Sequence, residues 1–261
     1  MSADPALERA AAAALATRYQ GLPDGQAVDR GGWSVLSWPR RPQAAWAHRV
    51  VALGPVSGAS LDTALDGLPG LPVLACVPDG WLDGSELSRR GFDMPVRLVR
   101  LLAPAAAIQS APRDPGWIEM VGPQGGGEVS AVGRAGGGPE EPWWWVAPLG
   151  AAGWTQLVAY DGDDPVATGA VHVAGQVGAL DGVTAVPGER GRLAGTAVVR
   201  RLVQLATERG AERVTVAAEP GTPHHGDLLD VGFAPAYGLG QWSRSDGTRG
   251  AGAQAAPGRQ T

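Results

Sequence analysis

The chain has 261 residues, 44% of them hydrophobic, and a formal net charge of −5. This length and hydrophobic content allow a large buried core and exclude a disordered chain. The negative charge argues against a nucleic-acid partner, because phosphate backbones are bound by basic faces.

Residues 1–19 are rich in alanine and predict a helix. Asp4 and Glu8 stand where a secretory signal would carry positive charge, so we do not expect a signal peptide. No stretch is apolar and long enough to cross a bilayer, and we expect a cytoplasmic protein without a membrane partner. The single cysteine, Cys76, excludes an internal disulfide, and no Cys/His cluster has zinc spacing, so no metal is expected.

The second half of the chain alternates strand and helix patterns, which predicts a mixed α/β fold. Strands are expected at 155–160 and 166–173, joined by a hairpin turn, and at 176–186. A helix follows, in which apolar residues recur on one face up to Gly210. A strand at 213–218, a short helix ending near 233 and a last strand near 237–244 complete the half. The glycine-rich segment 122–138 is expected to be mobile.

The chain also contains an internal similarity. Residues 73–92 align without a gap with residues 214–233. The coinciding pairs are Val73/Val214, Gly80/Gly221, Leu87/Leu228, Gly91/Gly232 and Phe92/Phe233. Pro55 precedes Val73 by 18 positions and Pro187 precedes Val214 by 27, so the first copy is nine residues shorter (27 − 18). We predict two tandem lobes, 1–104 and 113–245, with a linker at 105–115 and a flexible tail at 246–261.

The turn that precedes the long helix of the second lobe has the features of a phosphate site. The free backbone N–H groups and the positive end of the helix dipole point at one place. Arg190 and Arg192 add positive charge there. The chain has no lysine, which excludes a P-loop, and Gly191 and Gly195 lack the spacing of a dinucleotide fingerprint.

This turn resembles the cofactor motif of the GNAT acyltransferase superfamily, Gln/Arg-x-x-Gly-x-Gly/Ala after a Val-x-Pro strand end. Arg190 occupies the first position and Gly195 the last, whereas Leu193 replaces the usual middle glycine and keeps its backbone N–H. The resemblance implies a GNAT fold over roughly residues 113–245, with acetyl-CoA or another acyl-CoA as cofactor. The first lobe looks like a degenerate GNAT-like repeat that has lost the cofactor loop. The residues that the resemblance implies for cofactor binding are Thr184, Ala185, Val186, Arg190, Gly191, Arg192, Leu193, Ala194, Gly195 and Thr196.

The resemblance further implies that an amine attacks the thioester directly, while backbone N–H groups of residues 184–186 meet the carbonyl. Family members often protonate the leaving sulfur with a tyrosine, but Leu228 occupies that position here. A usual cofactor-contacting asparagine is replaced by Gly221. Another residue must therefore transfer the proton if the protein is an enzyme.

Asp181, Glu219 and His224 are the candidates for proton transfer. Asp181 lies on the strand that should face the thioester and is either a base or a solvated carboxylate. Strict alternation places it on the same face as Val183 and Ala185 unless a bulge intervenes. Glu219 is alternatively a surface charge, and His224 an exposed loop histidine.

Trp143, Trp144, Trp145 and Tyr237 are candidates for the acceptor pocket. The alternative is packing between the lobes, and we expect at least one of the three tryptophans in the core and one near the cleft. The acidic neighbours Glu140 and Glu141 favour a cationic amine.

Two functions remain open from sequence. One is an N-acetyltransferase acting on the amine of a small molecule or peptide. The other is a catalytically degenerate GNAT-fold protein that binds CoA or acyl-CoA as a sensor or structural subunit. The acceptor and the acyl chain length stay open, and a homodimer is compatible with either function.

Overall fold

The computed structural model describes residues 2–108, 117–138 and 140–245. The predicted tail at 246–261 and residues 109–115 of the predicted linker lie outside this part of the chain. The described residues form one mixed sheet with helices packed on both faces, in the strand order β1-β2-β3-β4-β11-β5-β10-β9-β8-β7-β6. The mixed α/β class predicted from sequence is confirmed.

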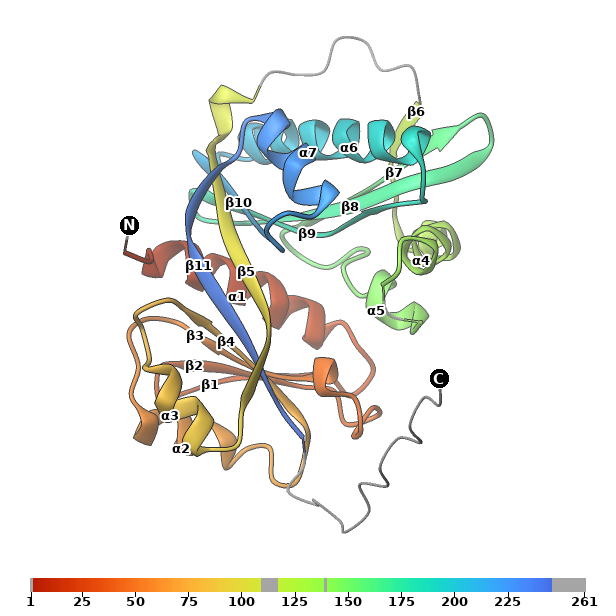
Figure 1. The fold of residues 1–261 in the computed structure, drawn as a ribbon. Coiled ribbons are helices and arrows are strands. Elements are labelled where there is room, and N and C mark those ends of the chain that lie inside the picture. The colour runs from red at the N-terminus through yellow and green to blue at the C-terminus, as the bar shows by residue number, and fades with distance from the viewer. Residues whose placement is uncertain (1, 109–116, 139, 246–261) are drawn as a thin grey trace, which may run out of the picture.

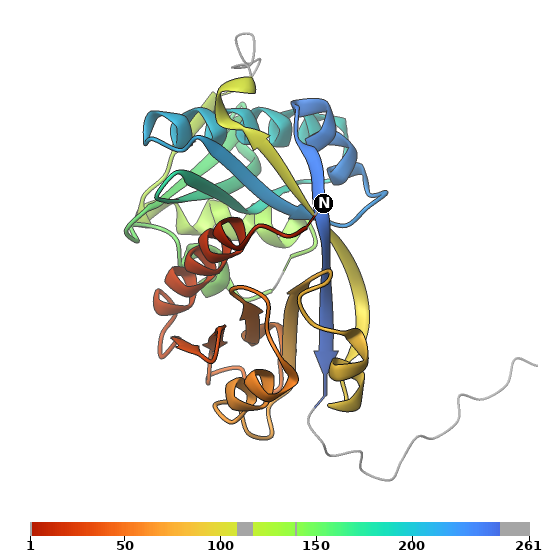
Figure 2. The same ribbon diagram turned by 90° about the vertical axis from the view of Figure 1, so that its left-hand side faces the viewer.

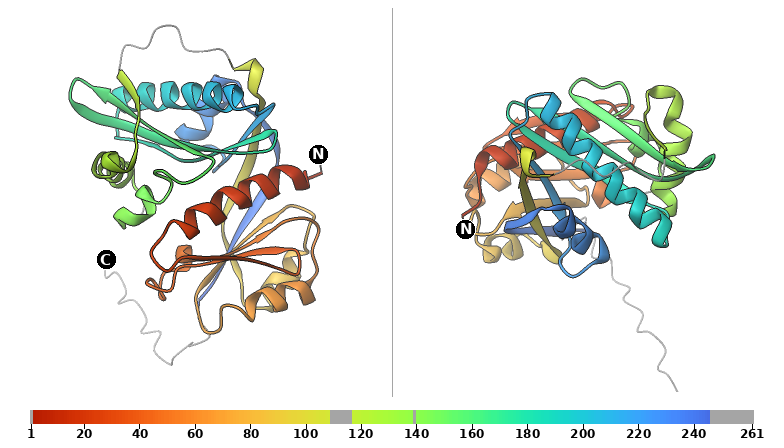
Figure 3. Two further views of the ribbon diagram at one scale, coloured as in Figure 1. Left: turned by 180° about the vertical axis from the view of Figure 1, so that it is seen from behind. Right: turned by 90° about the horizontal axis from the view of Figure 1, so that it is seen from above.

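The first half supplies one side of this sheet (Figure 1). Its strands are β1 (Gln26–Arg30), β2 (Trp33–Ser37), β3 (His48–Ala52), β4 (Val73–Pro78) and β5 (Asp93–Pro104). Its helices are α1 (Pro5–Gln20), α2 (Gly58–Leu65) and α3 (Gly84–Arg89), with short 3-10 turns η1 (Ala45–Ala47) and η2 (Ala105–Ala107). Helix α1 begins at an Asp4 cap and runs between the two halves, as the view from behind shows (Figure 3).

The second half supplies the other side. Its strands are β6 (Trp117–Met120), β7 (Trp154–Asp161), β8 (Asp164–Ala174), β9 (Val177–Ala185), β10 (Arg213–Ala218) and β11 (Ala234–Arg244). Its helices are α4 (Gly126–Ala135), α5 (Pro142–Val146), α6 (Glu189–Glu208) and α7 (Pro223–Val231), with a 3-10 turn η3 (Pro123–Gly125). Helix α6 buries its apolar face against one side of the sheet, and α4 and α5 lie against the opposite side (Figure 1).

The two halves exchange strands at the centre of the sheet. Strand β5 leaves the first half and pairs antiparallel with β10 of the second. Strand β11 returns from the second half and pairs antiparallel with β4 of the first. The two exchanged strands also pair with each other, and Figures 1 and 2 show them crossing from one half to the other. Each half therefore completes its sheet with a strand that the other half provides.

The segments that align in sequence adopt the same local structure. Each runs from a strand through a short helix into one of the exchanged strands: β4, α3 and β5 in the first, β10, α7 and β11 in the second. Both helices are followed by a glycine with positive φ, 78° at Gly91 and 119° at Gly232. In both, the phenylalanine N–H that follows donates to a leucine carbonyl at 3.1 Å, Phe92 to Leu87 and Phe233 to Leu228. This bond closes a helix C-terminus in the same way twice.

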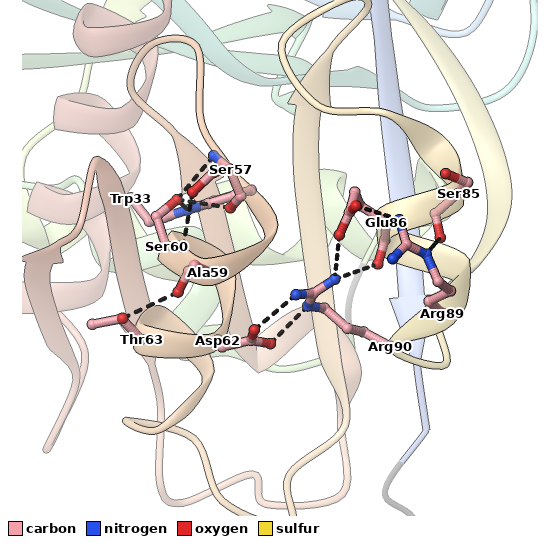
Figure 4. Close-up of polar contacts among 10 residues, drawn as sticks. All are labelled: Trp33, Ser57, Ala59, Ser60, Asp62, Thr63, Ser85, Glu86, Arg89 and Arg90. Atoms are coloured by element: carbon pink, nitrogen blue, oxygen red, sulfur yellow. Dashed lines mark hydrogen bonds and ion pairs between the residues drawn. The ribbon is translucent and has the colours of Figure 1, made fainter.

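The first half differs where the second has its long helix. Helix α2 has 8 residues, whereas α6 has 20. The space between α2 and α3 is bridged by Arg90, which binds Asp62 at 2.6 and 2.7 Å and Glu86 at 2.7 Å (Figure 4). The start of α2 is closed by a capping box in which Ser57 and Ser60 each accept the other's backbone N–H. Side chains therefore take up two of the backbone N–H groups at this helix start, whereas no side chain caps the start of α6.

The glycine-rich segment 122–138, which we expected to be mobile, is largely helical, because η3 and α4 occupy most of it. A Cβ at Gly133 or Gly138 would overlap the indole of Trp145. These glycines allow close packing of an aromatic ring, and this role is not distinguishable from a flexible linker by composition. No helix in the described part of the chain combines the length and apolar character needed to cross a membrane.

Candidate active site

A cavity of about 780 Å³ opens where β9 ends, between α6 and α7. Residues 183–186 of the strand end line one side of it. Among the residues that the family resemblance assigned to cofactor binding, six line this cavity: Thr184, Ala185, Val186, Arg192, Gly195 and Thr196. Gly188 and Glu189 at the start of α6 line it as well.

The start of α6 presents unpaired backbone donors to this cavity. Gly188 is the N-cap, with φ 109°, and it has no side chain that could accept from the first turn. The first intrahelical bond is donated by Arg192 to the Gly188 carbonyl at 3.0 Å. The preceding amides of the turn therefore have no partner within the helix, and they lie at its positive end. The corresponding position of α2 is capped by side chains.

A β-bulge interrupts β9 just before the cavity. Ala170 pairs with Asp181 and Thr168 with Thr184, so two residues of β9 oppose a single residue of β8. Gly182 lies in the bulge with φ 60°. The bulge reverses the faces of the strand relative to strict alternation.

The bulge is the exception to strict alternation that the sequence left open, and it places Asp181 on the face opposite to Val183 and Ala185. Val183 and Ala185 pack against the core beneath α6, whereas Asp181 points to the opposite face, toward α1. There its Oδ2 forms an ion pair at 2.9 Å with Nε of Arg18. The carboxylate also accepts the Gly182 N–H at 2.8 Å.

A second cavity, of about 310 Å³, lies on this opposite face, between the two halves. The two cavities share the lining residues Val183 and His224, and they therefore meet at the bulge. The charged residues that line the second cavity besides Asp181 are Glu8, Arg49 and Arg100. The strand exchange places this cavity between elements that are distant in sequence.

The buried side chain of Arg18 fixes the position of Asp181 through this ion pair. Its side chain is 1% exposed, against 28% for Asp181. Its Nη1 donates to the Trp144 carbonyl at 2.7 Å, and its guanidinium lies 5.0 and 5.4 Å from the ring centres of Trp144 and Trp154. Asp181 is therefore a positioned carboxylate and not a freely solvated one.

His224 is the second residue of α7 and the only one of the three proton-transfer candidates that lines both cavities. Burial lowers the pKa of its imidazole from 6.5, despite the opposing effect of Asp227, so the neutral form prevails at neutral pH. His224 lies one helical turn before Leu228, which lines the first cavity and cannot transfer a proton. Glu219 is exposed and lines neither cavity.

The two arginines of the motif have different surroundings. The side chain of Arg190 is 81% exposed, forms an ion pair with Asp161 of the β7–β8 hairpin and lines neither cavity. Arg192 lines the first cavity and binds Asp227 at 2.9 Å across it. Leu193 is 50% exposed, and it lies outside the cavity lining, as do Gly191 and Ala194.

The predicted acceptor-pocket residues do not line either cavity. Trp144 and Trp145 are buried, as expected for part of the triplet, and Trp143 is exposed. Tyr237 is buried between the halves, where its hydroxyl donates to Glu8 at 2.8 Å. Strand β11, which carries Tyr237, belongs to the exchanged pair, and this pairing was not visible in the sequence.

Sequence reasoning missed Glu8, Arg49 and Arg100. Arg100 binds Glu8 through two hydrogen bonds of 2.8 Å in the buried region between the halves. Arg49 lies on β3 and lines the second cavity. All three belong to the first half, on α1, β3 and β5, and no local motif marks them, since they reach the site only through the packing of the two halves.

The bulged strand β9 thus ends against the uncapped start of α6, next to two cavities that share the lining residues Val183 and His224. Residues 133–237 match the family model described as the acetyltransferase (GNAT) family. Residues 133–237 of the second half therefore match a GNAT acetyltransferase domain, as the motif at the start of α6 predicted.

Solved structures share this fold over nearly the whole chain. The GCN5-related N-acetyltransferase from Kribbella flavida is 17% identical, with a TM-score of 0.66 over 91% of this chain and 95% of that one. A functionally unknown conserved protein from Staphylococcus epidermidis is 12% identical, with a TM-score of 0.62 over 85% and 95%. The GCN5-related N-acetyltransferase from Sphaerobacter thermophilus is 14% identical, with a TM-score of 0.55 over 82% and 76%. No curated protein matches the sequence significantly.

Proposed function

We propose that this protein is an acyltransferase that moves an acyl group, acetyl in the simplest case, from acyl-CoA to the amine of a small molecule or peptide. The observation that carries the proposal is that two cavities next to β9 share the lining residues Val183 and His224. A carrier bound in one cavity and an amine bound in the other would be brought together at this point.

The larger cavity suits the carrier. Its volume of about 780 Å³ falls within the usual range of ligand pockets. The uncapped amides at the start of α6 would hold phosphate groups, and Arg192 would add charge. Val186 at the strand end already donates its N–H to the Val166 carbonyl at 2.9 Å. A backbone N–H of residue 184 or 185 would therefore be the one directed at the thioester carbonyl. Acyl-CoA, when bound, supplies the activated acyl group.

His224 is the residue we assign to proton transfer. In its neutral form it can accept the proton of the amine that attacks the thioester; when the C–N bond has formed and the C–S bond breaks, the imidazolium can return a proton to the leaving thiolate. His224 lines both cavities. Asp181, held by Arg18, would attract and orient the protonated amine before reaction. We assign no role to Glu219, because it lies outside both cavities.

We also propose that the two halves are tandem copies of one GNAT-like unit, with boundaries near 1–104 and 113–245. The shared helix ending at Gly91 and Gly232 supports a duplication. The short, internally capped α2 and the Asp62–Arg90–Glu86 bridge support a single cofactor site, located in the second half.

The function is tested by two measurements on the full chain. Calorimetry with acetyl-CoA measures binding, and thiol release over a panel of primary amines measures transfer. We expect saturable binding and release that depends on the amine. Binding without amine-dependent release would favour the sensor or structural role, and absence of binding would refute the cofactor site.

A further inference from the structure

We propose, on the basis of the acyltransferase function above, that the acceptor is a small amine that also carries a carboxylate, and that Arg49 binds this carboxylate. The second cavity holds the evidence, since it is lined by both acidic and basic side chains from the two halves.

The charges around this cavity do not balance. Glu8 is paired with Arg100, and Asp181 is paired with Arg18. Arg49 forms no ion pair with any carboxylate in the described part of the chain. Its Nε donates to the Trp46 carbonyl at 3.1 Å, and its guanidinium lies 5.4 Å from the Trp144 ring centre. Asp181 also attracts Arg49, so this one carboxylate is shared between the guanidinium groups of Arg18 and Arg49, and one positive charge remains in excess.

The polar neighbours of Arg49 do not balance that charge. Burial raises the pKa of the Tyr19 phenol to about 12 and also raises the pKa of the Cys76 thiol. Both groups are therefore neutral at pH 7. A partly buried guanidinium without an anion is unfavourable, and the planar guanidinium matches a carboxylate through two parallel hydrogen bonds.

A carboxylate fits better than a phosphate for two reasons. The surplus is a single positive charge, whereas a phosphate monoester carries nearly two negative charges at neutral pH. The cavity of about 310 Å³ is at the lower end of ligand pockets, which favours a molecule of amino-acid size.

The second cavity also has side chains that can bind the amino group of such an acceptor. Asp181 lines it with a negative charge, and His224 lines it at the junction with the first cavity. A ligand with its carboxylate at Arg49 would meet Asp181 and His224 with its ammonium group. The residues that suggested a cationic acceptor lie elsewhere: Glu140 is exposed, Glu141 pairs with Arg41, and neither lines either cavity.

The test compares matched acceptors in the wild-type protein. Thiol release from acetyl-CoA is measured for a panel of free amino acids and for the carboxamide of each. We expect kcat/KM to be at least about tenfold higher for the carboxylate member of the best pair, the equivalent of one charged hydrogen bond. Equal rates for both members of every reactive pair would overturn the proposal.

Variants then assign the selectivity to Arg49. We expect Arg49→Met to bring the carboxylate-to-carboxamide ratio close to one and Arg49→Lys to restore part of it. Arg97→Met is the matched control, because Arg97 pairs with Asp79 on the surface and lines neither cavity. An Arg49→Met protein that is folded by circular dichroism and keeps the wild-type ratio would contradict the assignment.

A binding measurement separates this proposal from the proposed function. N-acetyl amino acids and N-acetyl amino-acid amides are titrated into the protein in the presence of CoA. Tighter binding of the carboxylate members supports the acceptor class even if no turnover is observed, in which case only the acyltransferase function fails. Indifference to the carboxylate, or no binding of either series, refutes the acceptor class.

Discussion

At the scale of single residues, the cofactor motif contains two arginines whose roles separate once they are placed in space. Arg192 lines the larger cavity beside Asp227, and Arg190 is directed to the hairpin, where it meets Asp161. An arginine contributes to phosphate binding only where its guanidinium reaches the ligand.

We therefore expect Arg192→Ala to raise the KM for acetyl-CoA about tenfold, which corresponds to ~1.4 kcal/mol. Arg190→Ala should change this KM by less than about threefold. Steady-state kinetics at several salt concentrations make the comparison. A larger effect for Arg190 would mean that its pairing with Asp161 is broken when the cofactor binds.

The second prediction at this scale concerns proton transfer by His224. Replacement by glutamine should lower kcat by at least about a hundredfold, which is the usual contribution of a general base. His225→Gln is the control, because the neighbouring His225 lines neither cavity.

The pH profile provides the corresponding check. Burial places the pKa of His224 below 6.5, so the wild-type enzyme should keep its activity at pH 7 and lose it as the pH falls through that lowered value. The acid limb should be absent from the residual activity of His224→Gln. An unchanged acid limb in that variant would assign proton transfer to another group.

At the scale of elements, the first turns of α6 combine helix formation with ligand access. Gly195 lies inside this helix, and a Cβ there would meet only the Cβ of Ala185 at 3.5 Å. A side chain at this position is therefore compatible with the fold, but it would extend into the larger cavity. Glycine at position 195 leaves room for a ligand in the larger cavity, at a cost to the stability of the helix.

Gly195→Leu should raise the free energy of unfolding by roughly 0.5–1 kcal/mol through helix propensity and should weaken acetyl-CoA binding by at least about tenfold. Gly226→Leu in α7 is the matched control, because a Cβ there meets no atom within 4 Å and the residue lines neither cavity. Urea unfolding and calorimetry measure the two effects. Parallel loss of stability and binding in Gly195→Leu would point to local misfolding.

At the scale of the whole molecule, a buried network joins the two halves. Glu8 of α1 is fully buried and binds Arg100 of β5 and the hydroxyl of Tyr237 of β11. Its members thus come from the N-terminal helix and both exchanged strands. Removing the carboxylate would leave Arg100 charged and without a counter-ion.

We expect Glu8→Gln to lower the free energy of unfolding by about 3–5 kcal/mol. Tyr237→Phe should cost only about 1.5–3 kcal/mol, because it removes one hydrogen bond and leaves the ion pair. Urea titrations with equal m-values would make the comparison valid. A Glu8→Gln protein as stable as the wild type would show that the pair adds little to the association of the halves.

The last prediction follows from the exchange of strands β5 and β11. Residues 1–104 and 113–245, produced separately, should each lack a cooperative unfolding transition, because each is left without a strand supplied by the other. The intact chain should unfold in one transition followed equally by circular dichroism and tryptophan fluorescence. Two resolved transitions would indicate that the halves fold independently.

The sequence by itself determined the strands and helices from β7 to β11 and the cofactor turn, but not β6, α4 or α5. The apolar spacing of α6, its glycine-rich start and the Gly-Phe that follows α7 are set by contacts within about four residues, which a linear pattern records. The motif was sufficient to recognise the family domain at 133–237. Helix α1 was also predicted within a few residues of its bounds.

Only the tertiary structure decided which strands pair and which side chains share a cavity. The bulge at Gly182 placed Asp181 on the face of α1. The packing of α1, β3 and the exchanged strand β5 placed Glu8, Arg49 and Arg100 around the same cavity. A strand pairs with whichever sheet edge is free to form hydrogen bonds with it. In this protein the partner strands lie more than a hundred positions away in the sequence. A periodic sequence pattern indicates which face of a strand is buried, but not which strand lies beside it. For that reason the acceptor side of the site could not be predicted.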